Sequence, residues 1–329
     1  AALPPAPPIG LAPRAPTLEQ AGGVARLTLR GHTGPVTRAL VLPNGVDVAT
    51  AASDGVRVSD LEVGDCVLRL GHGGAVADVA VDGGGRLLLT AGLDGRARVW
   101  ELSGGKCVRE LDGHVGPIHA AALDGRGRLA LTAGADGTLR AWDVERGTCA
   151  AALVGHGGSG VRSLALSPDG RTALSGGEDF SAVVWDVLRG SAATRLAGHA
   201  GWVVGVALTP DGSAALTASH DGTARVWMLD HGGCCEHTLA GHTGRLSAVR
   251  VSGPDLALTA ADDGTARLWA WRDGTCVRVL SSGSGAWLSD AALVAGPPAP
   301  GPGVALTGAG DGSVTAWSVG GGSGGSGPP

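Results

Sequence analysis

Histidine, hydroxyl and carboxylate side chains recur along this 329-residue chain at nearly constant spacing. Gly-His pairs recur every 40 to 43 residues, from His32 to His242. An Asp follows each pair, with Thr or Ser four residues before that Asp and, in most copies, Trp six residues after it. The complete sets are His72, Thr90, Asp94 and Trp100; His114, Thr132, Asp136 and Trp142; His156, Ser175, Asp179 and Trp185; His199, Thr217, Asp221 and Trp227; and His242, Thr259, Asp263 and Trp269.

The same side-chain types make up a nucleophilic triad, in which a hydroxyl, a histidine and a carboxylate act in sequence. Such a hydroxyl must be open to substrate, and a catalytic set is normally built once. The set in this chain is repeated at constant spacing and ends in a Trp. We therefore interpret it as structural and expect no catalytic residue.

Between these landmarks the sequence alternates as β-strands do. Residues 75–92, "AVADVAVDGGGRLLLTAG", are two apolar runs joined by an Asp-Gly turn, which indicates a β-hairpin. The pattern recurs at 161–177, "VRSLALSPDGRTALSGG". Each copy thus supplies about four short antiparallel strands, and this period and strand count are typical of propeller blades.

Over residues 24–319 the chain resembles the WD40-repeat family. The resemblance implies an all-β fold, a seven-bladed β-propeller of four-stranded antiparallel blades. In this family the ring is closed by an N-terminal strand, here 25–30, which would join the last blade, 286–319. The Pro-rich residues 1–23 and the Gly/Ser-rich residues 320–329 are expected to lie outside the propeller as flexible segments.

The resemblance also assigns the repeated polar set a role inside each blade. The Asp accepts a hydrogen bond from one His nitrogen, the other His nitrogen meets the hydroxyl, and the hydroxyl meets the Trp N–H. Two copies are incomplete: Ser59 takes the Trp position in the first, and Gly283 lies near the expected His position in the seventh. These two blades would be neighbours at the seam of the ring, where we expect opening to begin.

Two other motifs have competing interpretations. His231, Cys234, Cys235 and His237 have zinc-ligand spacing, but one short tract rarely supplies a whole tetrahedral site, and the repeat already accounts for Cys235. Residues 155–160, "GHGGSG", lack the Lys of a phosphate-binding loop and are expected to be a turn. We expect no metal and no cofactor.

The cysteines follow the repeat, so that equivalent positions fall in different blades, too far apart for disulfides. They are interpreted as small apolar residues of a reduced, intracellular protein. Five of the six occupy these equivalent positions: Cys66, Cys107, Cys149, Cys235 and Cys276.

In the family, partners contact the face where inner strands begin and where the turn before each Asp lies; we name it the top face. Carried over by position, the inner-strand sites are Thr37, Ala77, His119, Arg162, Val204, Ser247 and Leu288. Blades four to six present the large and charged groups Arg162, Glu178, Phe180, Trp202, His220, Arg245 and Asp262, which form the predicted partner-binding set. Trp287 is expected in a core position, which leaves Trp202 without a structural role.

Phe180 is the sole phenylalanine of the chain and stands where other copies have Gly after the turn Asp. This substitution is either drift in one turn or part of the binding surface. Because it falls within the predicted set, we include it there.

Composition limits the function classes. No apolar run reaches the roughly 18 residues of a membrane span, and a net charge of −5 gives no reason to expect nucleic acid or an anionic membrane as partner. We therefore predict a non-catalytic scaffold that binds a protein or peptide, within a larger cytoplasmic protein or complex. The alternatives are a regulatory or sensor domain of a larger enzyme or NTPase, and a structural subunit of a large assembly such as a ciliary complex.

Overall fold

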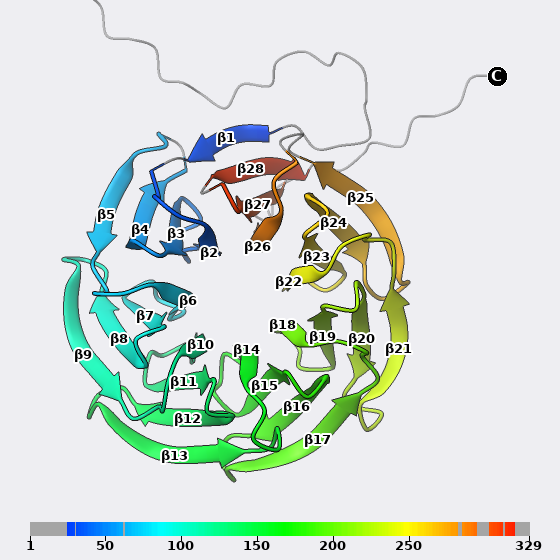
Figure 1. Ribbon diagram of the computed structural model, residues 1–329, viewed down its shortest axis with the longest axis horizontal. Helices are drawn as coiled ribbons and strands as arrows, with labels where there is room; N and C mark the ends of the chain where they lie inside the picture. The colour runs from blue at the N-terminus through cyan, green and yellow to red at the C-terminus, as the bar shows by residue number, and fades with distance from the viewer. Residues whose placement is uncertain are drawn as a thin grey trace, which may run out of the picture.

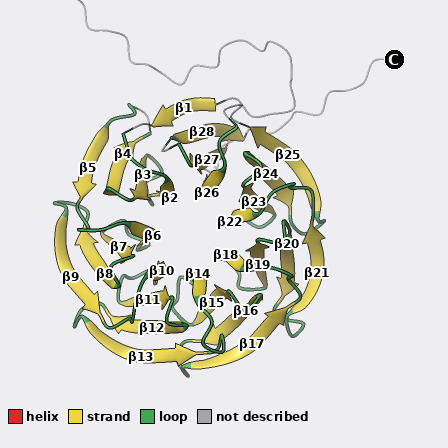
Figure 2. Ribbon diagram, in the orientation of Figure 1, coloured by secondary structure: helices red, strands yellow, loops and turns green. Residues whose placement is uncertain are grey.

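The structure is a computed structural model that describes residues 25–29, 31–61, 63–281, 285–294, 303–311 and 313–319. Within these ranges it contains 28 β-strands and no helix (Figure 2). The strands form seven four-stranded antiparallel sheets arranged in a ring around a central channel (Figure 1). In the part of the chain described, no helix is long and apolar enough to cross a membrane.

Each blade runs outward from the channel through four strands, which are consecutive in the chain in blades one to six. The inner strands are β2 (Val36–Val41), β6 (Val76–Val81), β10 (Ile118–Leu123), β14 (Val161–Leu166), β18 (Val203–Leu208), β22 (Leu246–Ser252) and β26 (Leu288–Val294). The second strands are β3 (Asp47–Ala52), β7 (Leu87–Gly92), β11 (Leu129–Gly134), β15 (Thr172–Gly177), β19 (Ala214–Ser219), β23 (Leu256–Ala261) and β27 (Gly303–Ala309).

The third and outer strands complete the blades. The third strands are β4 (Gly55–Asp60), β8 (Arg96–Glu101), β12 (Thr138–Asp143), β16 (Ser181–Asp186), β20 (Ala224–Met228), β24 (Thr265–Ala270) and β28 (Val314–Val319). The outer strands are β5 (Cys66–Leu70), β9 (Lys106–Asp112), β13 (Thr148–Val154), β17 (Ser191–Ala197), β21 (Cys234–Leu239), β25 (Thr275–Ser281) and, in blade seven, β1 (Ala25–Leu29). β1 pairs antiparallel with β28, so the two ends of the propeller meet in one sheet.

Burial follows the position of a strand in its blade. Every residue of β7 and β19 is buried, because neighbouring blades cover both faces of a second strand. Outer strands such as β13 expose most of their residues, because one face is open to solvent. The alternation predicted from sequence is clearest in third strands such as β8 and β12, and it is absent from the fully buried β7 and β19.

The core lies between blades, where the repeated Trp of one blade packs against the preceding blade. Trp142 of blade three, for example, packs with Leu89 of blade two. Between blades seven and one, Ser59 stands at the Trp position, and the described apolar residues that pack there contain no Trp. This interface therefore buries less aromatic surface than the others.

Candidate protein-interaction site

The repeated His–hydroxyl–Asp–Trp sets of blades three to six form continuous hydrogen-bond chains. In blade three His114 Nδ1 lies 2.9 Å from Asp136 Oδ2, and His114 Nε2 lies 2.8 Å from the Thr132 hydroxyl. Trp142 Nε1 donates to that hydroxyl over 2.8 Å. The same chain is made by His156, Ser175, Asp179 and Trp185; by His199, Thr217, Asp221 and Trp227; and by His242, Thr259, Asp263 and Trp269. The hydroxyls are buried, which is the opposite of what a nucleophile requires.

The Asp of each chain also holds the turn that follows it. Burial by itself would raise the pKa of Asp136, but hydrogen bonds from the Val115 N–H, Thr138 and His114 outweigh it and lower the pKa to about 2. Hydrogen bonds lower the pKa values of Asp221 and Asp263 to about 2 in the same way, again against burial. These carboxylates are ionised at neutral pH and fasten the loop, the turn and the third strand together.

In blade two the predicted direct hydrogen bond between His72 and Asp94 is not made, because Arg98 binds both side chains. Arg98 Nη1 lies 2.7 Å from His72 Nδ1 and 3.0 Å from Asp94, whereas His72 and Asp94 are 3.8 Å apart. The Thr90 hydroxyl donates to the Arg98 carbonyl and accepts from Trp100. Burial and then the charge of Arg98 lower the pKa of His72 to about 4, so this ring is neutral and accepts the arginine's hydrogen bond. The guanidinium thus replaces the direct His–Asp contact.

On the top face, Trp202 contacts two side chains of the predicted binding set. The Arg162 guanidinium carbon is 4.9 Å from the centroid of its ring, and the His220 ring centroid is 5.5 Å away at 30°. Arg162 Nε donates to Glu178 Oε1 over 2.7 Å. The indole remains 38% exposed. The set therefore includes a large aromatic surface that is held in place before any partner arrives.

A repeated backbone hydrogen bond on the same face shows which positions are equivalent. In blades two to seven the N–H of the residue before the turn Asp donates to the carbonyl just before the inner strand, as in His220 to Trp202 over 3.0 Å. In blade seven this bond joins Gly310 to Trp287, also over 3.0 Å. Trp287 is therefore the blade-seven counterpart of Trp202, and it is 44% exposed. The prediction that Trp287 lies in the core is wrong.

The predicted channel-facing residue of blade seven is also displaced by one position in the sequence. Leu288 is buried in the core, and Ser289 faces the channel in its place. The other six predicted inner-strand sites line the channel: Thr37, Ala77, His119, Arg162, Val204 and Ser247. Gly310 explains the Trp287 position, because a Cβ there would lie 2.2 Å from the indole.

Phe180 is 45% exposed and has a φ of 65°, the one non-glycine residue with positive φ in the described ranges. Equivalent turns use glycine, for example Gly137 at 75° and Gly222 at 84°. A bulky side chain is strained in this region, and such strain is concentrated at functional sites. The remaining predicted residues, Arg245 and Asp262, are both exposed on blade six.

Comparison with protein families agrees with this geometry. The family model described as WD domain, G-beta repeat matches residues 64–101, 105–143, 147–186, 190–228 and 233–270, more than half of the chain. The chain belongs to the WD40 family. The matched ranges leave out most of blade one and all of blade seven, the two blades whose polar sets are incomplete.

A buried ion cluster in the channel of this WD40 propeller was not predicted from sequence. Arg38 Nε lies 2.9 Å from Asp78 Oδ1, and Arg38 Nη1 lies 3.6 Å from Asp290 Oδ1. Arg250 Nη2 lies 2.6 Å from the same Asp290 oxygen. Burial, against the attraction of Arg38, raises the pKa values of Asp78 and Asp290 to about 6. Both are carboxylates at pH 7, and the cluster joins blades six, seven, one and two.

The cysteine interpretation is corrected in part. All six thiols are free and exposed on outer strands, rather than packed as small apolar residues. In the tract proposed as a zinc alternative, His237 Nε2 lies 2.8 Å from the Arg272 carbonyl. Within the described ranges, no group of three or more His, Cys, Asp or Glu side chains is placed to hold a metal ion.

Proposed function

We propose that this WD40 propeller is a non-catalytic protein-interaction module that binds a protein or peptide on its top face, centred on Trp202. The supporting observation is the exposed indole in contact with Arg162 and with the tilted ring of His220. Tryptophan and arginine are the residues that most often dominate the energy of protein interfaces. Equivalent positions in blades one to three are Pro or Ala, so the aromatic surface belongs to one side of the ring.

The corrected position of Trp287 widens the proposed surface to blade seven. Trp202, Arg245 and Trp287 occupy equivalent positions in three consecutive blades, and all three precede an inner strand. Arg245 is exposed between the two indoles. Two rigid aromatic groups with a cation between them fit a partner segment that crosses blades five to seven.

Truncation of the central indole tests this function. Trp202→Ala removes a large apolar contact, and we expect it to weaken binding about thirtyfold, or ~2 kcal/mol. A partner recovered with the intact chain would be titrated against each variant by calorimetry. Leu93→Ala is the control, because Leu93 is an exposed apolar residue on the same face of blade two, at the position equivalent to His220. Equal affinity of the Trp202 variant and the parent, with loss in the Leu93 variant, would place the site elsewhere.

The exposed thiols support a location for the protein. Six free, exposed cysteines are expected to persist in a reducing compartment and to react in an oxidising one. We therefore extend the proposal to a cytoplasmic module.

A further inference from the structure

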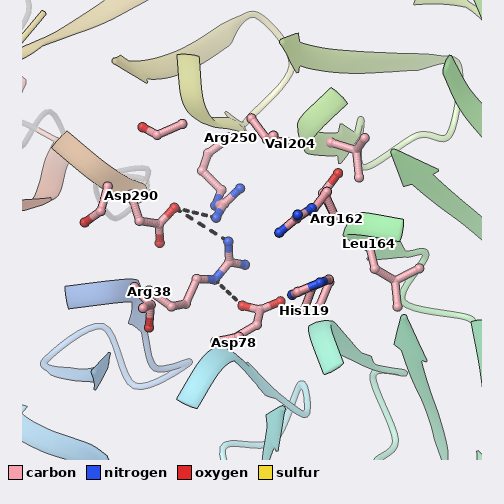
Figure 3. Close-up of a pocket in the computed structure, with 16 residues that line it drawn as sticks. Arg38, Asp78, His119, Arg162, Leu164, Val204, Arg250 and Asp290 are labelled. Atoms are coloured by element: carbon pink, nitrogen blue, oxygen red, sulfur yellow. Dashed lines mark hydrogen bonds and ion pairs between the residues drawn. The ribbon is translucent and has the colours of Figure 1, made fainter. Parts of the chain in front are cut away.

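The upper half of the propeller channel contains a small polar chamber. Its volume is about 100 Å³, and it opens between the inner strands below the top face. Figure 3 shows the side chains of Arg38, Arg250, Arg162 and His119 directed toward its centre from different blades. Arg162 is also the residue that stacks on Trp202, so the chamber adjoins the proposed partner surface.

The two carboxylates of the chamber are already engaged by the protein. Asp78 accepts the N–H groups of Val79 and Ala121 over 2.9 and 3.0 Å. Asp290 accepts the Ala39 N–H over 2.8 Å with one oxygen and Arg250 over 2.6 Å with the other. All four carboxylate oxygens therefore have a donor, which leaves them little capacity to bind an added cation.

Hydrogen-bond donors, in contrast, are in excess. Each guanidinium has five N–H groups and no acceptor. Although Arg38 Nε is close to Asp78, it is buried without a hydrogen bond of acceptable geometry, and the buried Ser247 Oγ, which lines the same chamber, also has no partner. Arg162 uses Nε and Nη2 on Glu178, so its Nη1 is not needed for that pair. The arginines and carboxylates at the chamber balance in charge, but they supply more hydrogen-bond donors than acceptors.

We propose that this chamber binds a carboxylate group of the partner. A carboxylate supplies two acceptor oxygens, matches the planar donor pairs of arginine, and is small enough for about 100 Å³. Its source is an Asp or Glu side chain, or the C-terminus, of a peptide that also contacts Trp202. This inference rests on the proposed function, because it names the group that the bound peptide directs into the channel.

Small carboxylates test the chamber without the partner. The full chain, labelled with ¹⁵N, would be titrated at pH 7 with sodium acetate and with methylammonium chloride at equal ionic strength. We expect saturable shifts of the Arg38 and Arg162 Nε–H signals and of the His119 ring with acetate alone. Parallel titrations with N-acetylglycine and N-acetyl-aspartyl amide separate the two sources, since the tighter probe identifies a terminal or a side-chain carboxylate.

Two arginine variants test whether these NMR shifts arise from acetate bound in the chamber. Arg162→Gln should weaken acetate binding at least tenfold, whereas Arg245→Gln, at an exposed arginine of the same face outside the chamber, should retain parental binding. Non-saturable acetate shifts, saturable methylammonium shifts, or equal losses in both variants would overturn the proposal. Trp202→Ala should bind acetate as the parent does. Absence of carboxylate binding in the chamber is thus distinguishable from absence of partner binding at Trp202.

Discussion

At the scale of single residues, Phe180 shows how one side chain can act against the stability of its own turn. A left-handed backbone conformation costs a non-glycine residue roughly 1–2 kcal/mol, and the equivalent turns avoid this cost with glycine. The ring is half exposed, so it gains little from packing. A residue that lowers stability and yet lies beside the proposed partner surface is more readily explained by binding than by folding.

Replacement of this residue should separate the two effects. We expect Phe180→Gly to raise the free energy of unfolding by about 1 kcal/mol, because the strain disappears, and to weaken partner binding. Urea denaturation gives the first quantity and calorimetry the second. Phe180→Ala is the control, since it removes the ring but keeps a Cβ at the strained positive-φ position. A stability gain without loss of affinity would mean that the substitution is drift.

At the scale of the blade, an arginine recurs on the third strand two residues before the Trp, as in Arg140 and Arg225. Blade four has the buried Val183 at this position. Its cross-strand partner on β17, Arg195, takes over: its Nη2 lies 2.6 Å from Asp179, and its Nη1 donates to the Gly155 carbonyl over 3.2 Å. The charge has moved to the neighbouring strand, and it contacts the turn Asp as Arg57 and Arg98 do in blades one and two.

This substitution between strands predicts a rescue. Arg195→Ala should lower the stability of the protein by about 1 kcal/mol, a value reduced because the side chain is half exposed. Adding Val183→Arg, which places an arginine where blades one to three, five and six have one, should recover most of the loss. Thermal or urea unfolding of the two variants checks this. A double variant less stable than Arg195→Ala alone would show that the Val183 site cannot accept the guanidinium.

The spacing of residues within a blade decides which features could be predicted from sequence. Strand number and the polar sets of blades three to six were predictable, because hydrogen-bonded groups within a blade keep constant spacing. In blade seven the Gly-His landmark is missing, and an error of one residue exchanges the two faces of a strand. Leu288, which was predicted to line the channel, therefore lies in the core, and Trp287, which was predicted in the core, lies on the surface. The Arg98 contact with His72 was missed because spacing does not report an arginine's direction.

At the scale of the whole molecule, the interface that closes the ring lacks, among the residues described, the Trp that packs between the other blades. The interface of blades seven and one has Ser59 at the Trp position, and a Trp buries 150–250 Å² of surface. What remains there is mainly ionic: Asp290 of blade seven accepts the Ala39 N–H and lies 3.6 Å from Arg38 of blade one, whereas the shorter pairs Arg38–Asp78 and Arg250–Asp290 cross the two neighbouring interfaces. The partners come from opposite ends of the chain at positions that no repeat landmark marks, so sequence could not predict the cluster.

These observations lead to a prediction about where the propeller opens. A buried ion pair compensates for desolvation less well than apolar packing does, so the interface of blades seven and one should open before the others. Hydrogen exchange should show less protection in 25–60 and 286–319 than in 160–230. Asp290→Asn keeps an acceptor for the Ala39 N–H but removes the charge that faces Arg38 and Arg250. In this variant exchange in β2 should accelerate at least tenfold, while β14 to β20 exchange as in the parent. Uniform protection around the ring, or acceleration spread equally over all blades, would show that the ring opens as one unit and that the seam has no special weakness.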